Sequence, residues 1–232
     1  MKKEFKLMIN IIKAAPQLKT RIINTLLFLI GGTLLEIGAS IHISYGVIGA
    51  VYLSITTTDI FKAIMSVSCS GLGQTSSSSK KLQVKFAFYI QLFMNIIFFF
   101  VISLHRVYIA NKPALDMSIK EDISLHCFNI ILFCVICFFL FIYETISPKF
   151  VRLSVFCMLL PFITIMILIT LTIKHSHSIF DISNLTFPIA IVTGLLLIIS
   201  GSLLSIILAS LLYKFPISER FMIVNNLPKR KA

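Results

Sequence analysis

The sequence contains few charged residues, and this scarcity argues against a water-soluble protein. Only 13% of the 232 residues are charged, and acidic residues number 9. Tryptophan is absent, whereas hydrophobic residues make up 57% of the chain and the mean hydropathy is +0.97. A water-soluble domain of this length covers its core with many more charged side chains. We therefore expect lipid to be the solvent for most of the chain.

Familiar catalytic motifs are missing as well. The segment Gly71–Lys80, GLGQTSSSSK, resembles a phosphate-binding loop at first sight. However, no glycine precedes its lysine, Lys81 stands where Ser or Thr is required, and no apolar strand leads into it. The G-x-S-x-G nucleophile elbow and the H-E-x-x-H zinc motif do not occur either. The sequence thus predicts no ATP site, no catalytic residue and no metal site of its own.

Cysteine and histidine are few, and neither forms a strong ligand pattern. The five cysteines are an odd number and lie mostly in apolar stretches, which argues against a disulfide scaffold. The five histidines all fall on one predicted side of the membrane, where a metal site or a pH sensor is the alternative to ordinary interfacial side chains. The histidines are His42, His105, His126, His175 and His177.

Six apolar stretches have roughly the 20 residues that a helix needs to cross the hydrocarbon of a bilayer. They cover about Ile22–Ile43, Tyr45–Ser66, Val84–His105, Leu125–Thr145, Phe150–Ile173 and Phe187–Tyr213. The fold class is therefore all-α, a polytopic membrane protein with six transmembrane helices in one domain. Spans one and two fill 22–66, spans three and four 84–145, and spans five and six 150–213, with a tail at 214–232.

The basic residues are distributed unequally between the segments that connect these spans. Of the 21 Lys and Arg residues, 17 fall on one side and 4 on the other, namely Arg106, Lys112, Lys120 and Lys174. Because Lys and Arg in short loops stay on the cytoplasmic side, both termini are expected to be cytoplasmic. The net charge of +12 is then explained by orientation and by contact with anionic lipid, and a nucleic-acid partner is not expected.

The N-terminal segment 1–21 combines six basic residues with apolar residues on one helical face. Phe5, Met8, Ile9 and Ile12 form this face, and Pro16 is expected to end the helix before span one. The pattern is typical of an amphipathic helix that lies in the membrane interface.

Three ionisable residues are candidates for a polar lining inside the bundle. Glu36 lies in span one, while Asp59 and Lys62 lie one turn apart in span two. Ionisable groups in membrane spans usually face a bundle interior or water. The alternative for Asp59 and Lys62 is that they pair with each other near the interface, where the lysine reaches the headgroups.

Spans two and three are joined by the longest polar stretch of the chain, residues 67–85, which ends in three lysines. With the amphipathic N-terminal segment, six spans and both ends inside, this arrangement resembles the permease subunit of type-two ATP-binding-cassette exporters. The resemblance implies that Met1–Ala15 form an elbow helix and that the loop carries a helix that docks on a separate ATPase. The implied coupling residues are Gly71, Gly73, Gln74, Lys80, Lys81 and Lys85.

The resemblance further implies two permease subunits and two ATPases in a bacterial cell membrane, with ATP and magnesium on the partner subunits. The exported substrate would be amphipathic or hydrophobic, such as a peptide, lipid or antibiotic. That family usually has re-entrant helices between spans five and six, so either residues 179–194 dip into the membrane or the resemblance is one of topology alone. The alternatives are a substrate-capture subunit of a vitamin-type importer and a small membrane channel or enzyme.

Overall fold

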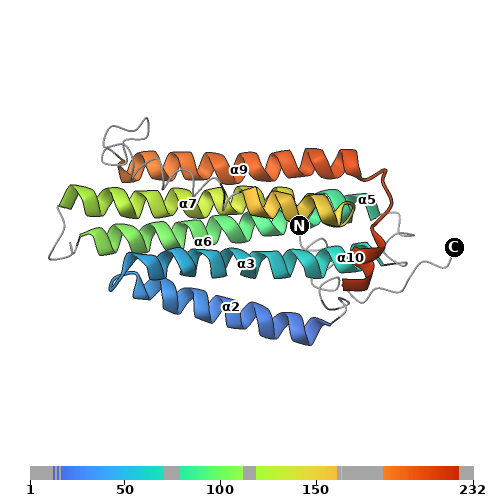
Figure 1. Cartoon of the computed structure of the whole chain (residues 1–232), viewed down its shortest axis with the longest axis horizontal. Helices are drawn as coiled ribbons and strands as arrows, with labels where there is room; N and C mark the ends of the chain where they lie inside the picture. The colour runs from blue at the N-terminus through green and yellow to red at the C-terminus, as the bar shows by residue number, and fades with distance from the viewer. Residues whose placement is uncertain are drawn as a thin grey trace, which may run out of the picture.

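The computed structural model describes residues 13, 15, 17–70, 79–111, 119–160, 163 and 185–224, and every regular element in these ranges is helical. Five helices are long and apolar enough to cross a membrane, and they lie side by side (Figure 1). They are α2 (Leu18–Gly38), α3 (Ile43–Ser68), η1 with α6 (Leu82–Phe86 and Ala87–Ala110), α7 (Ile119–Ile146) and α9 (Phe187–Leu212). By length and composition the chain is a multi-pass membrane protein.

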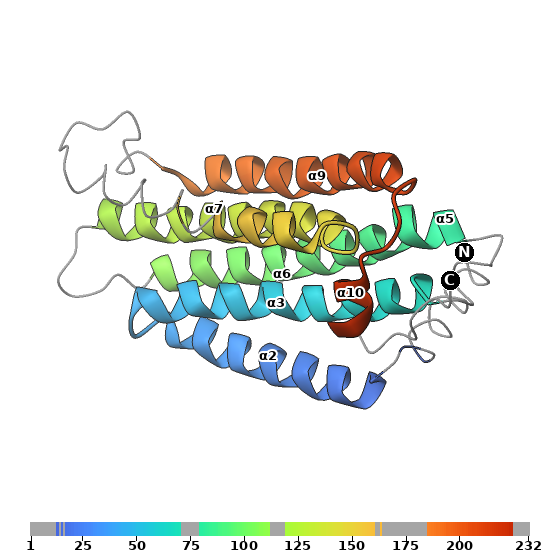
Figure 2. The ribbon, with the colours of Figure 1, turned by 45° about the vertical axis from the view of Figure 1, so that its right-hand side comes forward.

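The bundle has two distinct ends. At the turn end, residues 39–42 connect α2 to α3, α6 finishes and α7 begins. At the basic end, α2 begins and α3, α7 and α9 finish, and the short helices α5 (Ser79–Lys81) and α10 (Glu219–Val224) lie there (Figures 1 and 2). A further apolar helix, Val151–Leu160, starts from the basic end after α7.

Helices α3, α6 and α7 form the centre of the bundle, with α2 packed on α3 and with α9 packed on α7 and α6. The two outer helices leave large apolar side chains uncovered. Leu27 and Leu34 on α2 are each 64% exposed, and Leu211 on α9 is 63% exposed. Apolar surface on this scale is unfavourable in water, so these faces are suited to contact with lipid.

Glycines set the closest helix contacts. A Cβ atom on Gly49 of α3 would lie 2.7 Å from the backbone nitrogen of Glu36 on α2. A Cβ atom on Gly201 of α9 would lie 3.1 Å from the Cα of Phe138 on α7. At both positions the absence of a side chain lets two helices approach each other closely.

The first helix begins earlier than the sequence predicts. Helix α2 starts at Leu18 instead of Ile22, so Lys19 and Arg21 belong to the first span and not to the interfacial segment. Gln17, which precedes the helix, has a left-handed backbone conformation with a φ of 57°, directly after Pro16, where a helix was expected to end. Residues 1–12, on which most of the elbow-helix prediction depends, lie outside the described residues.

At the turn end, α2 stops at Gly38 instead of Ile43, whereas α6 and α7 are longer than predicted. Helix α6 continues five residues beyond His105, to Ala110, and α7 begins at Ile119 instead of Leu125. The predicted boundaries followed the charged residues at these positions, which usually mark the membrane surface. In the folded protein Arg106, His126 and Asp122 contact one another inside the bundle, so these charges do not mark the ends of the helices.

The fifth predicted span is described in part and the sixth throughout. The helix Val151–Leu160 covers the beginning of the fifth span, whose remainder lies almost entirely in residues left undescribed. Helix α9 begins at Phe187 as predicted and runs without interruption through Gly194 to Leu212. The part of the possible re-entrant segment from 187 to 194 is therefore the start of α9, and residues 179–184 lie outside the described residues. The C-terminal tail is described only as far as Val224.

Candidate functional site

Near the turn end, a buried group of charged side chains connects three helices. Glu36 of α2 accepts a hydrogen bond of 2.9 Å from Nη2 of Arg106 on α6, and the Arg106 Nε atom lies 2.8 Å from the other carboxylate oxygen. His105 Nδ1 lies 3.2 Å from the same Glu36 oxygen. The Arg106 Nη1 atom lies 3.3 Å from Nδ1 of His126 on α7. We call Glu36, His105, Arg106, His126 and Asp122 the charge cluster.

The local structure explains why these groups meet. Glu36 lies one turn after Gly32 on the buried stripe of α2 and is 4% exposed. Arg106 is fully buried, and its guanidinium lies against Gly46 of α3, where a Cβ atom would be only 1.6 Å from Nη2. The glycine therefore supplies the space that the guanidinium occupies.

The donors and acceptors of the cluster determine the protonation of His126. A guanidinium carries only donors, so His126 Nδ1 must accept and its proton is on Nε2. That Nε2 atom lies 3.6 Å from Oδ1 of Asp122, one turn earlier on α7. The result is a chain of polar contacts from α2 through α6 to α7. Such a cluster can hold the three helices together and can respond to protonation of its histidines.

Sequence reasoning found part of this cluster. Glu36 was a candidate for a polar lining, and in the structure it is buried and contacts Arg106. Arg106 was missed because it was counted as a loop residue on the outer side. The signal that could have found Arg106 was its position along the helix. Glu36, Arg106 and His126 all lie within two turns of the helix ends at the turn end, and so at a similar level in the bundle.

A second polar group lies toward the basic end. Glu144 on α7 is 1% exposed, and neither of its carboxylate oxygens has a hydrogen-bond partner. Gln91 of α6 and Thr58 of α3 lie beside it, and Asp59 and Lys62 of α3 act on it electrostatically. Glu144 was not singled out in the sequence, although it is an acidic residue within a predicted span. We call these five residues the inner polar group.

The predicted polar lining is thus divided between two places. About 13 residues of α3 separate Gly46, at the level of Glu36, from Asp59, which at 1.5 Å per residue is about 20 Å. Among the described residues no ion pair within 4.0 Å joins Asp59 to Lys62, although the two interact electrostatically, as do Asp59 and Arg21 of α2. The direct pair that was considered for Asp59 and Lys62 is therefore not formed.

The predicted coupling lysines are exposed at the basic end. Lys80 and Lys81 lie on α5 and Lys85 lies on η1, and both elements continue directly into α6. The Gln83 amide donates a hydrogen bond of 3.1 Å to the backbone oxygen of Ser68, which fixes this extension against the end of α3. Gly71, Gly73 and Gln74 lie outside the described residues.

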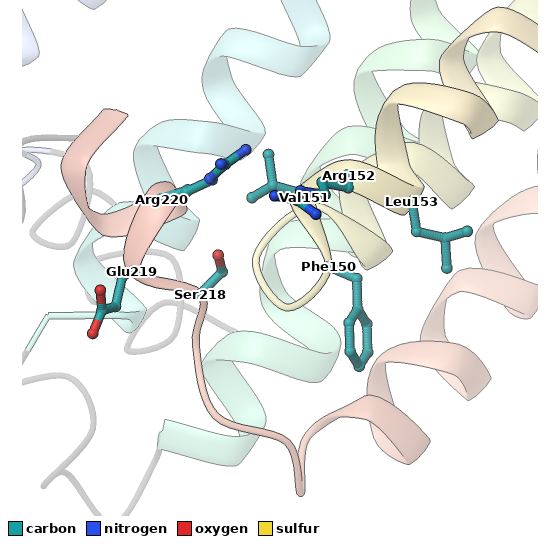
Figure 3. A pocket seen from close by; sticks show the side chains of 7 residues that line it. All are labelled: Phe150, Val151, Arg152, Leu153, Ser218, Glu219 and Arg220. Carbon is teal, nitrogen blue, oxygen red and sulfur yellow. The ribbon is translucent and has the colours of Figure 1, made fainter.

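An open pocket of about 410 Å³ adjoins this end, between α10 and the helix Val151–Leu160 (Figure 3). In Figure 3 the side chains of Arg152 and Arg220 extend toward the space between the two helices, while Glu219 points away from it. The Ser218 backbone nitrogen donates a hydrogen bond of 2.9 Å to the Pro148 oxygen, which holds α10 in place. The exposed surface of the basic end therefore includes arginines as well as lysines.

One cysteine at the basic end provides a test of packing. Cys69, directly after α3, is 2% exposed, and burial raises the pKa of its thiol to about 11, with Lys149 acting in the opposite direction. We expect Cys69 to react with a maleimide far more slowly at pH 7.5 in the folded protein than after denaturation, because a thiolate is the reactive form. Peptide mass spectrometry measures this, and equal labelling rates in the two states would contradict the packing.

His42 is the one remaining histidine among the described residues. His42 caps α3, with its Nδ1 accepting from the Ser44 backbone nitrogen at 3.3 Å, while His175 and His177 lie outside the described residues. In the described ranges no three His, Cys, Asp or Glu side chains are grouped to hold a metal ion.

No protein-family model, no curated protein and no solved structure matches this chain.

Proposed function

We propose that the chain is the membrane subunit of an ATP-driven exporter, oriented with its basic end in the cytoplasm. The observation that carries this proposal is the helical extension α5–η1, which presents Lys80, Lys81 and Lys85 to solvent and continues into the central helix α6. A force applied to this extension by a partner acts directly on a helix that contacts α3, α7 and α9. This is the mechanical requirement for coupling a soluble motor to a helix bundle.

The charge of this surface suggests the partner. Exposed lysines on the extension and exposed arginines around the pocket favour an acidic docking groove on a soluble ATPase subunit. The uncovered apolar faces of α2 and α9 are available to lipid and to a second permease subunit, which the exporter requires in order to enclose a transport path. An amphipathic or hydrophobic substrate fits such a path better than a strongly charged one.

Reversing the charge of the extension tests the proposal. Because the ATPase would dock through electrostatic contacts here, we expect Lys80→Glu with Lys81→Glu to lower co-purification of the ATPase and the stimulated ATP hydrolysis by tenfold or more, about 1.4 kcal/mol. The measurement uses the chain co-expressed with its ATPase in lipid nanodiscs.

The matched control is Lys13→Glu with Lys19→Glu, which makes the same change of charge at exposed positions of the same end. It should leave both readings within twofold of the unaltered chain. Normal assembly and hydrolysis in the Lys80 and Lys81 variant would refute the docking role of this extension.

An ion-conducting membrane protein is the second candidate, and the inner polar group is the observation that favours it. A carboxylate buried among helices is a feature of ion and proton pathways. Flux through liposomes that contain this chain alone would support that candidate, whereas flux that requires the ATPase and ATP supports the exporter.

A further inference from the structure

The inner polar group contains buried polar atoms that lack hydrogen bonds. Both carboxylate oxygens of Glu144, both amide atoms of Gln91 and Oδ2 of Asp59 have no hydrogen-bond partner. Glu144 and Gln91 are each 1% exposed. Leaving one such group unsatisfied costs about 1–3 kcal/mol, and an ionised carboxylate costs more. The burial of this cluster is therefore least costly when the carboxyl carries a proton that it can donate to a neighbouring acceptor.

The neighbours of Glu144 determine which groups can form a hydrogen bond with it. From α3, the Thr58 hydroxyl lies beside the carboxyl and also donates a hydrogen bond of 3.3 Å to the Ser54 oxygen, so it is shared between two acceptors. From α6, Gln91 offers an amide oxygen that needs a donor and an amide nitrogen that needs an acceptor. Helix α9 carries no titratable residue, and on α7 itself Cys137 is the titratable group that interacts with Glu144.

Charged groups of both signs act on the carboxyl. On α3, Asp59 is negative and Lys62 is positive, and Arg21 of α2 interacts with Asp59. Asp59 and Lys62 are only half-buried and lie in the half of α3 nearer the basic end.

We propose that Glu144 binds and releases a proton inside the bundle, with Gln91 as its partner and with Asp59 and Lys62 as its connection to the basic end. When the carboxyl takes up a proton it changes from an acceptor to a donor, and its O–H can bond to the Gln91 amide oxygen. Loss of the proton to the basic end leaves a carboxylate that Lys62 stabilises. This proton site goes beyond the proposed export function and does not depend on it.

A hydrophobic carbodiimide tests the proposal, because it reacts with protonated carboxyl groups in an apolar environment. We expect peptide mass spectrometry of the full chain in liposomes to find the adduct on Glu144. Its amount should decrease with rising pH, about tenfold per unit once the group ionises. Lys62→Met should increase labelling at a given pH, because the cation that favours the ionised form is lost, and Asp59→Asn should decrease it.

Glu36 is the internal control, because it is almost as buried but paired with Arg106. It should remain unlabelled throughout. Infrared spectroscopy provides a reading that does not depend on reagent access: the unaltered protein at pH 6 should show a protonated-carboxyl band that is lost in Glu144→Gln. Absence of this band, or labelling of Glu144 that does not change with pH, would overturn the proposal.

Discussion

Replacing Arg106 with methionine is expected to destabilise the folded protein by about 3–5 kcal/mol, the cost of leaving one partner of a buried ion pair without the other. Glu36 would then remain 4% exposed with its opposite charge removed. His126 would lose the donor at its Nδ1 atom as well. Thermal unfolding in detergent with a thiol-reactive dye measures this, because four of the five cysteines are buried in the folded protein.

The double variant Arg106→Met with Glu36→Gln separates the ion pair from general damage. Removing both charges should recover much of the lost stability, because no uncompensated charge then remains in the bundle. The matched control is Arg152→Met, which removes an exposed arginine near the basic end and should change stability by less than about 0.5 kcal/mol. If the single Arg106 variant is as stable as this control, the charge cluster does not stabilise the bundle.

Gly46→Ala is the second change with a large expected effect. The added Cβ atom would lie 1.6 Å from Arg106 Nη2 and 2.8 Å from the Cβ of Ala39. The guanidinium must move, and its contacts with Glu36 and His126 are lost or lengthened. We expect a destabilisation of about 1–3 kcal/mol, which is typical of overpacking, although alanine favours a helix more than glycine does.

Gly31→Ala is the control for this substitution. It lies in α2, and a Cβ atom there meets only the Tyr52 ring, at 3.4 and 3.6 Å, which is ordinary contact distance. This variant should be neutral or more stable by up to about 1 kcal/mol. In the Arg106→Met background the Gly46 substitution should cost less than in the unaltered chain, and an unchanged cost would show that the glycine does not make room for the guanidinium.

Hydropathy and spacing were sufficient to predict the helices because a membrane allows few alternatives. A long apolar stretch must satisfy its own backbone groups, and a helix does this within the segment. All five long helices therefore overlap their predicted ranges, and α3 and α9 match them to within two residues at both ends. The short connection between α2 and α3, predicted at Ser44, lies at residues 39–42. The ends of α6 and α7 were less predictable, since Arg106, Asp122 and His126 appear in a sequence as surface charges.

Pairing of side chains from different helices could not be predicted in the same way. Asp59 and Lys62 are three residues apart, and a local pair was a reasonable alternative to a polar lining, yet Asp59 also interacts with Arg21 of another helix. Glu144 was overlooked because it stands near the end of a predicted span, where an acidic residue can reach water. Its burial depends on the packing of α3, α6 and the segments around them.

The sequence by itself determined that this chain is a bundle of apolar helices with its basic residues gathered toward one end, because lipid constrains composition and helix length locally. Only the tertiary structure decided that Glu36 pairs with Arg106 in a space left by Gly46, and that Glu144 is buried without a partner. Those facts depend on the rotation and register of three or more helices relative to one another, and shifting a helix by one residue rotates its side chains by about 100° and breaks such contacts.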